Sequence, residues 1–539
     1  MSARVTISNT NIPVTEGMVV PRYSTLQIDS VATAGGSCTG MAWANTSEPS
    51  CEPTGYEWQR TPSHTQVSVN ITSGTDVFEF IVGNVWPRTT DQHVLDTQSA
   101  DTTGPNSQWA YWPGTYTFHI YANTNQTPCN LEPYLTEEKI ITVFVGDDDG
   151  ATDFGATSCP NEIGNKAVGE PINVTNGNMY LQQTDYRLPG IGGGLDLTRT
   201  YNSQMQRAGL FGFGWSSMLD ESIKTYDPKL IRLSLADGRA VYLARPSSTA
   251  PYVPVPPGDF RGQVVQNGDN TYTLTLKDGG VHQFDASGKL LSFTDANNNS
   301  VSLSYDGSGH PVTITDAAGR TVTLTYDGEG KVGTLSDSLG TIATYTHSYW
   351  GRLTAVAYPD GSGFNFSDSF VGNFIFITSV TDVLGNVLES HTYDSQGRAL
   401  TSEIAGNGTE RYTLNYVSAT ETDVTDALSH VTKYFYDRSK GRNVVTSVEG
   451  SCSCGGSQIQ TWVYDNQLNV TSKTDALNHT TASTYDPNGN KLTETNVLGT
   501  TSFTYNSLGE VLTTTDPMSG VWTNTYDSHR NLLTAKDAL

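Results

Sequence analysis

The stretch Tyr305-Asp-Gly-Ser-Gly309, which recurs as Tyr326-Asp-Gly-Glu-Gly330, decides the fold of this chain. Both belong to a series in which an aromatic residue, Asp, two variable residues and Gly recur with the glycines 21 residues apart. The series begins at Phe284-Asp285 and has a degenerate member at His347-Ser348. A fixed period of this length is the signature of a repeat array, whose units all fold in the same way.

The unit between two such segments is predicted to be a β-hairpin. In Thr321-Val-Thr-Leu-Thr-Tyr326, the apolar residues share one face of a strand and the threonines share the other, so one face packs and the other meets solvent. Aspartate accepts hydrogen bonds from backbone N–H groups two residues on, and glycine adopts positive φ, so Tyr-Asp-x-x-Gly closes the hairpin. A second series in the same phase, Thr294-Asp295, Thr315-Asp316 and Ser336-Asp337, marks the other turn of each unit.

The predicted turn residues are interpreted as structural, because a residue needed in every unit is more simply a turn former than a catalytic carboxylate. The repeated tyrosines are interpreted as cross-strand packing, with a glycan-stacking ladder as the alternative. The register slips between residues 352 and 463 and returns at Tyr464. The predicted turn residues are Tyr305, Asp306, Gly309, Tyr326, Asp327, Gly330, Tyr393, Asp394, Gly397, Tyr485, Asp486 and Gly489.

Composition favours an all-β protein and argues against several classes of function. Gly reaches 52 and Tyr 27 of 539 residues, and charged residues make up only 16%, which favours strands and turns over helices. The net charge of −25 excludes a basic surface for nucleic acid. The chain contains no run of 18 apolar residues, so no membrane span is predicted. The first residues of the chain as given show no signal peptide.

Residues 1–146 show no repeat and predict a separate β-sandwich of the immunoglobulin-like kind. Its last hairpin is expected at 114–122 and 138–146, where apolar and polar residues alternate, and Trp58 is the expected core tryptophan. Trp109, Tyr111 and Trp112 are candidates for stacking on a sugar, with packing against a loop as the alternative.

Metal and disulfide candidates lie mostly outside the repeats. Residues 147–164 predict an acidic linker, in which Asp147, Asp149 and Asp153 are a calcium candidate without the full spacing of an EF-hand. Cys38 and Cys51 are a candidate disulfide. Cys452 and Cys454 offer half of a metal site, but no second pair accompanies them. No other cofactor is expected.

Three ordered motifs occupy residues 165–245. They are Gly169-Glu-Pro-Ile-Asn-Val-Thr-Asn-Gly-Asn178, Leu195-Asp-Leu-Thr-Arg-Thr-Tyr-Asn-Ser203 and Phe211-Gly-Phe-Gly-Trp215. In the second, Leu195, Leu197 and Arg199 alternate with polar residues, as in a half-buried strand. With the Tyr-Asp array at 246–539, this part resembles bacterial Rhs and wall-associated YD-repeat proteins, including polymorphic toxins.

The resemblance implies a plug-like domain at 165–245 that seals one end of a β-strand spiral, a partial β-cocoon shell. The array is expected to be truncated within a unit at Lys536-Asp-Ala-Leu539, which leaves an incomplete spiral. The implied function is a non-catalytic, extracellular or cell-surface scaffold of bacterial origin that encapsulates or presents a C-terminal cargo of the toxin-delivery type. The alternative is an adhesin or fibre that binds glycan or protein through its N-terminal sandwich and self-associates through strand edges.

No catalytic constellation accompanies these features. The chain has no G-x-x-x-x-G-K-[ST], H-E-x-x-H or G-x-S-x-G motif, so no enzyme activity is expected. Isolated histidines such as His282 and His347 are expected at the surface.

Overall fold

The computed structural model divides the chain into two compact units, residues 1–148 with 226–230, and residues 149–225 with 231–539. It describes the strands of residues 1–146, and residues 167–538 apart from 191–193, 206, 256–258, 373, 407, 409, 438–441 and 452–456. The described residues are nearly all strand and turn, as composition predicts, and contain no α-helix. None of them forms a helix suited to crossing a bilayer.

The first unit contains two four-stranded sheets, with strand orders β2-β1-β4-β5 and β3-β8-β7-β6. β7 and β8 form the predicted hairpin, in which Gly114 pairs with Val145. Its immunoglobulin-like character remains a prediction, and Trp58 lies outside the described residues. The strands are β1 Ser2–Ile7, β2 Ile12–Val14, β3 Val19–Pro21, β4 Thr25–Val31, β5 Thr65–Asn70, β6 Val77–Val82, β7 Gly114–Asn123 and β8 Leu135–Gly146.

The region before the repeats folds into small sheets around buried apolar residues. In β12 the alternation predicted from sequence is present, since Leu195, Leu197 and Arg199 are all buried. β12 lies between β11 and β15 in a three-stranded sheet, and β16 to β19 form a four-stranded sheet. The elements are β9 Ala167–Val168, β10 Ile172–Asn173, β11 Tyr180–Leu188, β12 Leu195–Asn202, β13 Ala208–Gly209, β14 Gly212–Phe213, β15 Trp215–Ser217, the 3-10 turn η6 Met218–Asp220, β16 Ser222–Asp227, β17 Leu230–Ser234, β18 Ala240–Ala244 and β19 Val253–Pro254.

The repeats form one 26-stranded antiparallel sheet in which every strand pairs with the next along the chain. Its strands are β20 Gly262–Gln266, β21 Tyr272–Leu276, β22 Val281–Phe284, β23 Leu290–Thr294, β24 Ser300–Tyr305, β25 Pro311–Thr315, β26 Thr321–Tyr326, β27 Val332–Asp337, β28 Gly340–His347, β29 Leu353–Ala357, β30 Gly363–Val371, β31 Phe374–Asp382, β32 Val387–Tyr393, β33 Ala399–Ile404, β34 Tyr412–Ser418, β35 Glu421–Thr425, β36 Val431–Asp437, β37 Val444–Ser451, β38 Ser457–Tyr464, β39 Val470–Thr474, β40 Thr480–Tyr485, β41 Lys491–Asn496, β42 Gly499–Tyr505, β43 Val511–Thr515, β44 Val521–Tyr526 and β45 Leu532–Lys536.

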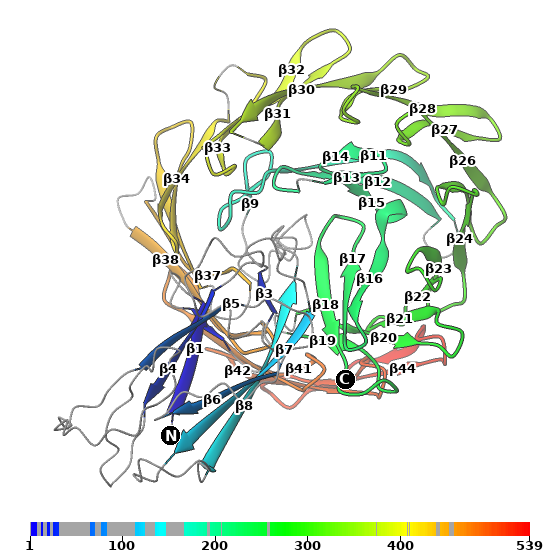
Figure 1. The fold of residues 1–539 in the computed structure, drawn as a ribbon. Helices are drawn as coiled ribbons and strands as arrows, with labels where there is room; N and C mark the ends of the chain where they lie inside the picture. Colours follow the sequence, from blue (N-terminus) through cyan, green and yellow to red (C-terminus); the bar gives the residue numbers. More distant parts are fainter. Residues whose placement is uncertain are drawn as a thin grey trace, which may run out of the picture. The chain divides into compact units, whose positions relative to one another are not determined.

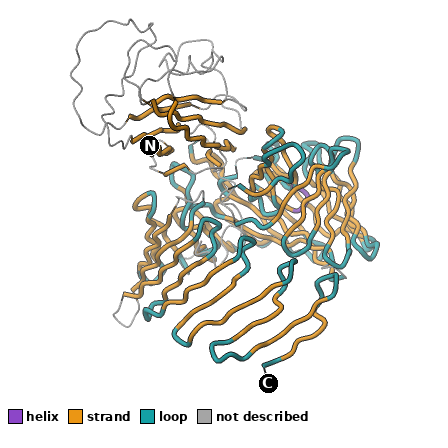
Figure 2. The backbone as a smooth tube through the Cα atoms, turned by 90° about the horizontal axis from the view of Figure 1, so that it is seen from below, coloured by secondary structure: helices purple, strands orange, loops and turns teal. Residues whose placement is uncertain are grey.

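Because the sheet is a simple meander, its turns fall along two edges (Figure 2). Turns that join an even-numbered strand to the next lie on one edge, here called the Tyr-Asp edge, and include the Tyr-Asp-x-x-Gly segments. Turns that join an odd-numbered strand to the next lie on the other, the Thr-Asp edge. In Figure 1 the strip curves around β11–β15, passing from green through yellow to red.

The strip packs its apolar face inward. Val322 and Leu324 are buried and Thr321, Thr323 and Thr325 are exposed, as the alternation predicts. The inward residues join Tyr201, Phe211 and Trp215 of the preceding region in one hydrophobic cluster. Burial of this shared face holds the curved sheet around the smaller sheets.

Candidate functional site

Each Tyr-Asp turn is closed by hydrogen bonds from its own backbone N–H groups to the aspartate side chain. Asp306 Oδ1 accepts from the backbone N–H of Ser308 and of His310, each at 2.9 Å, and Gly309 has φ +85°. Asp327, Asp394 and Asp486 accept from residues two and four positions on in the same way, and their glycines also have positive φ. The hydrogen bond from the N–H of His310 lowers the pKa of Asp306 below its ordinary value, so this turn keeps an ionised acceptor.

The tyrosine hydroxyls bind one unit to the previous one. The ladder between β39 and β40 ends at Ser472 and Ala482, three residues before Tyr485, and the Tyr485 hydroxyl donates to the carbonyl of Val470 at 2.9 Å. The same bond starts from eight tyrosines: Tyr305, Tyr326, Tyr393, Tyr416, Tyr464, Tyr485, Tyr505 and Tyr526. Burial raises the pKa of Tyr305 to about 12, which keeps this hydroxyl protonated as a donor.

Turns of the Tyr-Asp edge between residues 288 and 399 contact the region before the repeats. Four backbone hydrogen bonds of 2.8–3.1 Å join them: Ile223 to Gly288, Val332 to Leu210, Phe213 to Gly351, and Ala399 to Gly177. Each lies at a turn of the Tyr-Asp edge. An added Cβ on Gly288 would lie 1.8 Å from the carbonyl oxygen of Ile223, so only glycine permits this approach.

A buried ion pair anchors the same region to the inner face of the strip. The guanidinium of Arg199 in β12 bonds Asp185 in β11. Asp185 also accepts from the hydroxyls of Tyr345 in β28 and of Tyr358 in the turn after β29, both at 2.7 Å, so two parts of the array meet one carboxylate. The Arg199 guanidinium lies 4.7 Å from the Trp215 ring centroid. Burial opposes the charge on Arg199, but the neighbouring Asp185 carboxylate outweighs that effect and raises the pKa of the guanidinium above its ordinary value.

Two histidines expected at the surface instead contact this region. His347 Nε2 lies 3.1 Å from the carbonyl oxygen of Phe211 and Nδ1 lies 3.0 Å from Asp327 Oδ2, with the side chain only 2% exposed. His282 Nδ1 lies 2.5 Å from Glu221 Oε1. The surface expectation is therefore wrong. The repeat offered a signal, because His347 stands 21 residues after Tyr326 and so takes the inward position of a repeat tyrosine.

The end of the strip returns to its beginning. Arg530 Nη1 donates to the carbonyl of Lys277 at 2.7 Å, and Asn531 Nδ2 lies 2.7 Å from Asn297 Oδ1. Arg261, just before β20, donates to Asn469 Oδ1 at 2.8 Å. Turns of the late Tyr-Asp edge thus lie against turns of the early Thr-Asp edge, a contact here called the seam. The strip completes one turn of a spiral.

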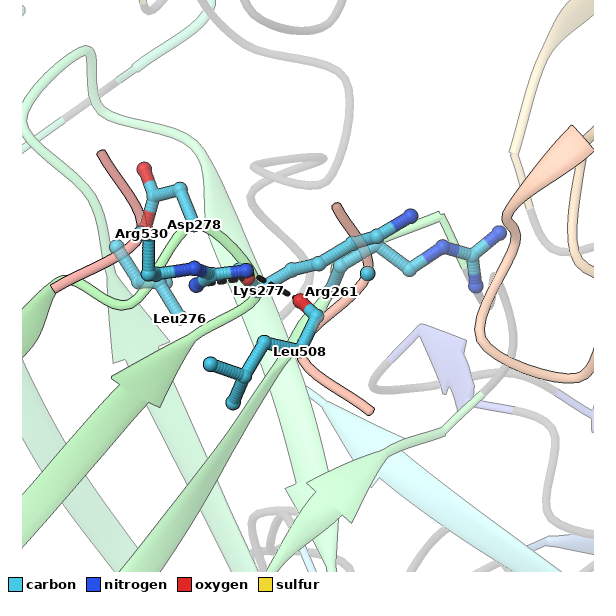
Figure 3. Close-up of a pocket in the computed structure, with 7 residues that line it drawn as sticks. Arg261, Leu276, Lys277, Asp278, Leu508 and Arg530 are labelled. Carbon is cyan, nitrogen blue, oxygen red and sulfur yellow. Dashed lines mark hydrogen bonds between the residues drawn. The ribbon is translucent and has the colours of Figure 1, made fainter. Parts of the chain in front are cut away.

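An open pocket of about 400 Å³ lies at the seam (Figure 3). Its charged lining is Arg261, Lys277, Asp278 and Arg530, and Arg530 also bonds Glu510 and the carbonyl of Leu508. Burial and the neighbouring Arg261 lower the pKa of Lys277. Arg261 and Arg530 each donate a hydrogen bond across the seam, so the lining of the pocket joins the two edges that meet there.

The remaining predicted site residues lie outside the described part of the chain. These are the aromatic candidates Trp109, Tyr111 and Trp112, the cysteines Cys38, Cys51, Cys452 and Cys454, and the calcium candidates Asp147, Asp149 and Asp153. Within the described ranges, no group of three or more His, Cys, Asp or Glu residues is arranged to hold a metal ion. The glycan, disulfide and calcium hypotheses stay predictions.

Comparison with known proteins gives two family matches. Residues 169–243 match a domain of unknown function, DUF6531, and residues 284–321 and 305–342 match the RHS repeat. Over 296 residues, 50% of this chain, the sequence is 24% identical to the tRNA nuclease WapA of Bacillus subtilis (strain 168). It is also 24% identical, over 292 residues, to the tRNA3(Ser)-specific nuclease WapA of Bacillus spizizenii. The chain spans 12% of the length of these relatives.

Two solved structures are more distant in sequence. The TcdB2-TccC3-Cdc42 complex is 12% identical, with 64% of this chain and 24% of that chain covered and a TM-score of 0.27. The Photorhabdus luminescens Tc holotoxin pore is 11% identical, with 70% and 26% covered and a TM-score of 0.32. The assignment therefore depends on sequence: the 21-residue period, the Tyr-Asp-x-x-Gly turns and the matched RHS repeats identify this chain as an Rhs/YD-repeat protein.

Proposed function

We propose that this chain is the sealed end and first wall turn of a non-catalytic YD-repeat shell, which encapsulates or presents a cargo polypeptide of the toxin-delivery type. In this proposal, residues 165–245 are the end seal, residues 246–539 are the wall, and residues 1–146 are an independent sandwich joined by the linker 147–164. The shell acts outside the cell or at its surface.

The observation that carries the proposal is that the seal covers one edge of the strip. Four backbone hydrogen bonds fix it to turns of the Tyr-Asp edge, and the Asp185–Arg199 pair fixes it to the inner face. A sheet that curves round on itself and is sealed at one end separates its interior from solvent at that end. Beyond the seam, tips of the Thr-Asp edge such as Leu384 and Leu428 are exposed, which leaves this side open to a cargo.

The relatives help to define the cargo. Their names describe tRNA nucleases, yet the matched part is 12% of their length. We infer that the matched part is wall and that nuclease chemistry belongs elsewhere in those proteins. The described residues of this chain offer an array of repeated turn carboxylates bound to their own backbone, which leaves them unsuited to acid–base chemistry.

A fused reporter tests the proposal. A small folded protein with a protease-sensitive linker is attached after Leu539, and the matched control carries it before Met1. The proposal predicts slower cleavage of the linker after Leu539 than of the control linker, because the wall restricts access. Equal cleavage rates contradict encapsulation, and cleavage of tRNA by the unfused chain contradicts the non-catalytic role.

A further inference from the structure

Histidines interrupt the inner face of the strip at three places, all of them beside the region before the repeats. His282 and His391 stand two residues before the aromatic residue that opens a Tyr-Asp turn, the position of Leu324 in the unit 321–337. His347 stands at the position of Tyr326. The other histidines of the described strip lie in turns: His310, His430, His479 and His529.

The departure from the repeat is largest in β32 and β33. In the unit 321–337, the cross-strand partners Leu324 and Leu335 are both buried. The equivalent partners here are His391 and Ser402, which are 3% and 0% exposed, and the His391 ring lies beside the buried Glu389. Burying polar groups in place of apolar ones costs free energy unless partners satisfy them. A strip standing alone would therefore be more stable with apolar residues at these positions.

The region before the repeats supplies a partner for this polar unit. The backbone N–H of Glu170 donates to Ser402 Oγ at 2.9 Å. A Cβ on Gly169 would lie 2.7 Å from the same oxygen, so a side chain larger than serine at position 402 leaves no room for this turn. Nearby, the N–H of Ala399 donates to the carbonyl of Gly177 at 2.9 Å. Serine thus fits the approaching turn in both size and hydrogen bonding.

The other two places follow the same logic. The hydroxyl of Tyr326 donates to a carbonyl of the strip itself, whereas His347, at the equivalent position, contacts the carbonyl oxygen of Phe211. His282 takes a leucine position and contacts Glu221. At all three places, a residue that would serve the strip is exchanged for one that contacts residues 165–245.

We propose that these three places form an address, which specifies the units of the strip on which residues 165–245 dock. A repeat array presents similar units many times, so apolar burial alone would accept several registers, and buried polar groups that must find their partners select one. The address concerns the contact itself, so it holds whether or not the strip encloses a cargo.

Restoring the repeat residues in the full chain tests the address. Glu389→Val, His391→Leu and Ser402→Leu give this unit the residues found at positions 322, 324 and 335. Hydrogen exchange read at single amides measures docking through Glu170 and Ala399, whose N–H groups donate across the contact. Exchange at both amides is expected to become about tenfold faster or more, while the amides of β26 and β27 and the melting temperature stay unchanged.

A second variant and a control complete the test. His347→Tyr is a single restoration, expected to speed exchange at the Phe213 amide, which also donates across the contact. Thr422→Val is the matched control, because this threonine is fully buried but its hydroxyl lies within hydrogen-bonding distance of that of Tyr436, within the strip. The control should leave all three amides protected.

Protection that persists in both restored variants overturns the address. A triple variant that no longer folds also overturns it, because the address predicts that the strip accepts the residues of its own repeat. Equal loss of protection in the control variant would contradict it as well, since the effect would then belong to any buried polar group.

Discussion

At the scale of single residues, the hydroxyl of each repeat tyrosine donates a hydrogen bond to a backbone carbonyl that lies beyond the end of the backbone ladder between two strands. Tyr393 shows this in a buried setting: it is 9% exposed, its hydroxyl donates to the carbonyl of Ile377 at 2.8 Å, and its ring stacks on Phe376 at 4.4 Å between centroids. The ring supplies packing and the hydroxyl supplies the hydrogen bond between units. The two contributions can be separated by removing the oxygen alone.

Tyr393→Phe is predicted to lower the free energy of unfolding by about 1–2 kcal/mol, because it leaves a buried carbonyl without its donor while the ring stays in place. Thermal or chemical unfolding measures the change. Tyr349→Phe is the control, since that ring is 79% exposed, and it should have no measurable effect. Equal effects of the two substitutions would show that the hydroxyl bond is not stabilising.

His347 makes stability depend on pH. Burial lowers its pKa below the ordinary 6.5, although Asp327 and the carbonyl of Phe211 oppose the shift, and Lys331 adds to it. The unfolded chain therefore binds this proton at a higher pH than the folded chain, so the contribution of His347 is intact above about pH 6.5 and is lost as pH falls from there towards the folded pKa. His347→Gln is predicted to reduce the fall in melting temperature between pH 7 and pH 5. The exposed His529→Gln should keep the wild-type slope, and a wild-type slope in both variants would contradict this role.

The sequence predicts the roles of the turn residues Asp and Gly, but not the contacts of the repeat tyrosines or of His347. The Asp and Gly of each turn follow from spacing, because their partners lie within four residues. The tyrosine bond was missed, since its acceptor lies about fifteen residues back and depends on where the ladder ends. His347 was wrongly expected at the surface, because nothing in the sequence around it indicates that its ring contacts the carbonyl of Phe211.

At the scale of elements, the contact between residues 165–245, the proposed seal, and the strip depends on close backbone approach. Gly288 and Gly319 both have positive φ, at +86° and +77°, but they differ in surroundings. A Cβ on Gly288 would collide with the Ile223 carbonyl, whereas nothing lies within 4 Å of a Cβ on Gly319. The pair therefore separates the conformational cost of alanine from the cost of disturbing the seal.

Gly319→Ala is predicted to cost about 1–2 kcal/mol, the usual penalty for a left-handed alanine. Gly288→Ala is predicted to cost more than this, because the seal must also move away from the turn. Unfolding measurements give the two values, and hydrogen exchange at the Ile223 amide reports the seal directly. Similar losses of stability in both variants would contradict the close contact.

The strands themselves were largely predictable, since the alternation at 321–326 and at 195–199 fixes which face packs. The contacts between the strands of residues 165–245 and the strands of the array were not predictable. Asp185 bonds Tyr345 and Tyr358, 160 and 173 residues away, and no pattern in either segment names the other.

At the scale of the whole second unit, the strip is a spiral that meets its own start. The period predicts a long twisted sheet, and twist predicts that the sheet curls, but the number of strands per turn depends on small angles summed over 26 strands. From the sequence we expected an incomplete spiral. The structure keeps an open edge but closes one turn, through Arg530, Asn531 and Arg261.

A short bismaleimide cross-link across the seam tests the central claim, that the strip closes one turn on itself. Cysteines replace Asn297 and Asn531, whose side chains are 2.7 Å apart, and a control pair replaces Asn297 and Leu428, on the same edge but twelve strands apart along the strip. Peptide mass spectrometry of the monomeric fraction identifies the linked residues. The closed spiral predicts an intramolecular link between positions 297 and 531 and none between 297 and 428; absence of the first link, with both cysteines reactive, would contradict it.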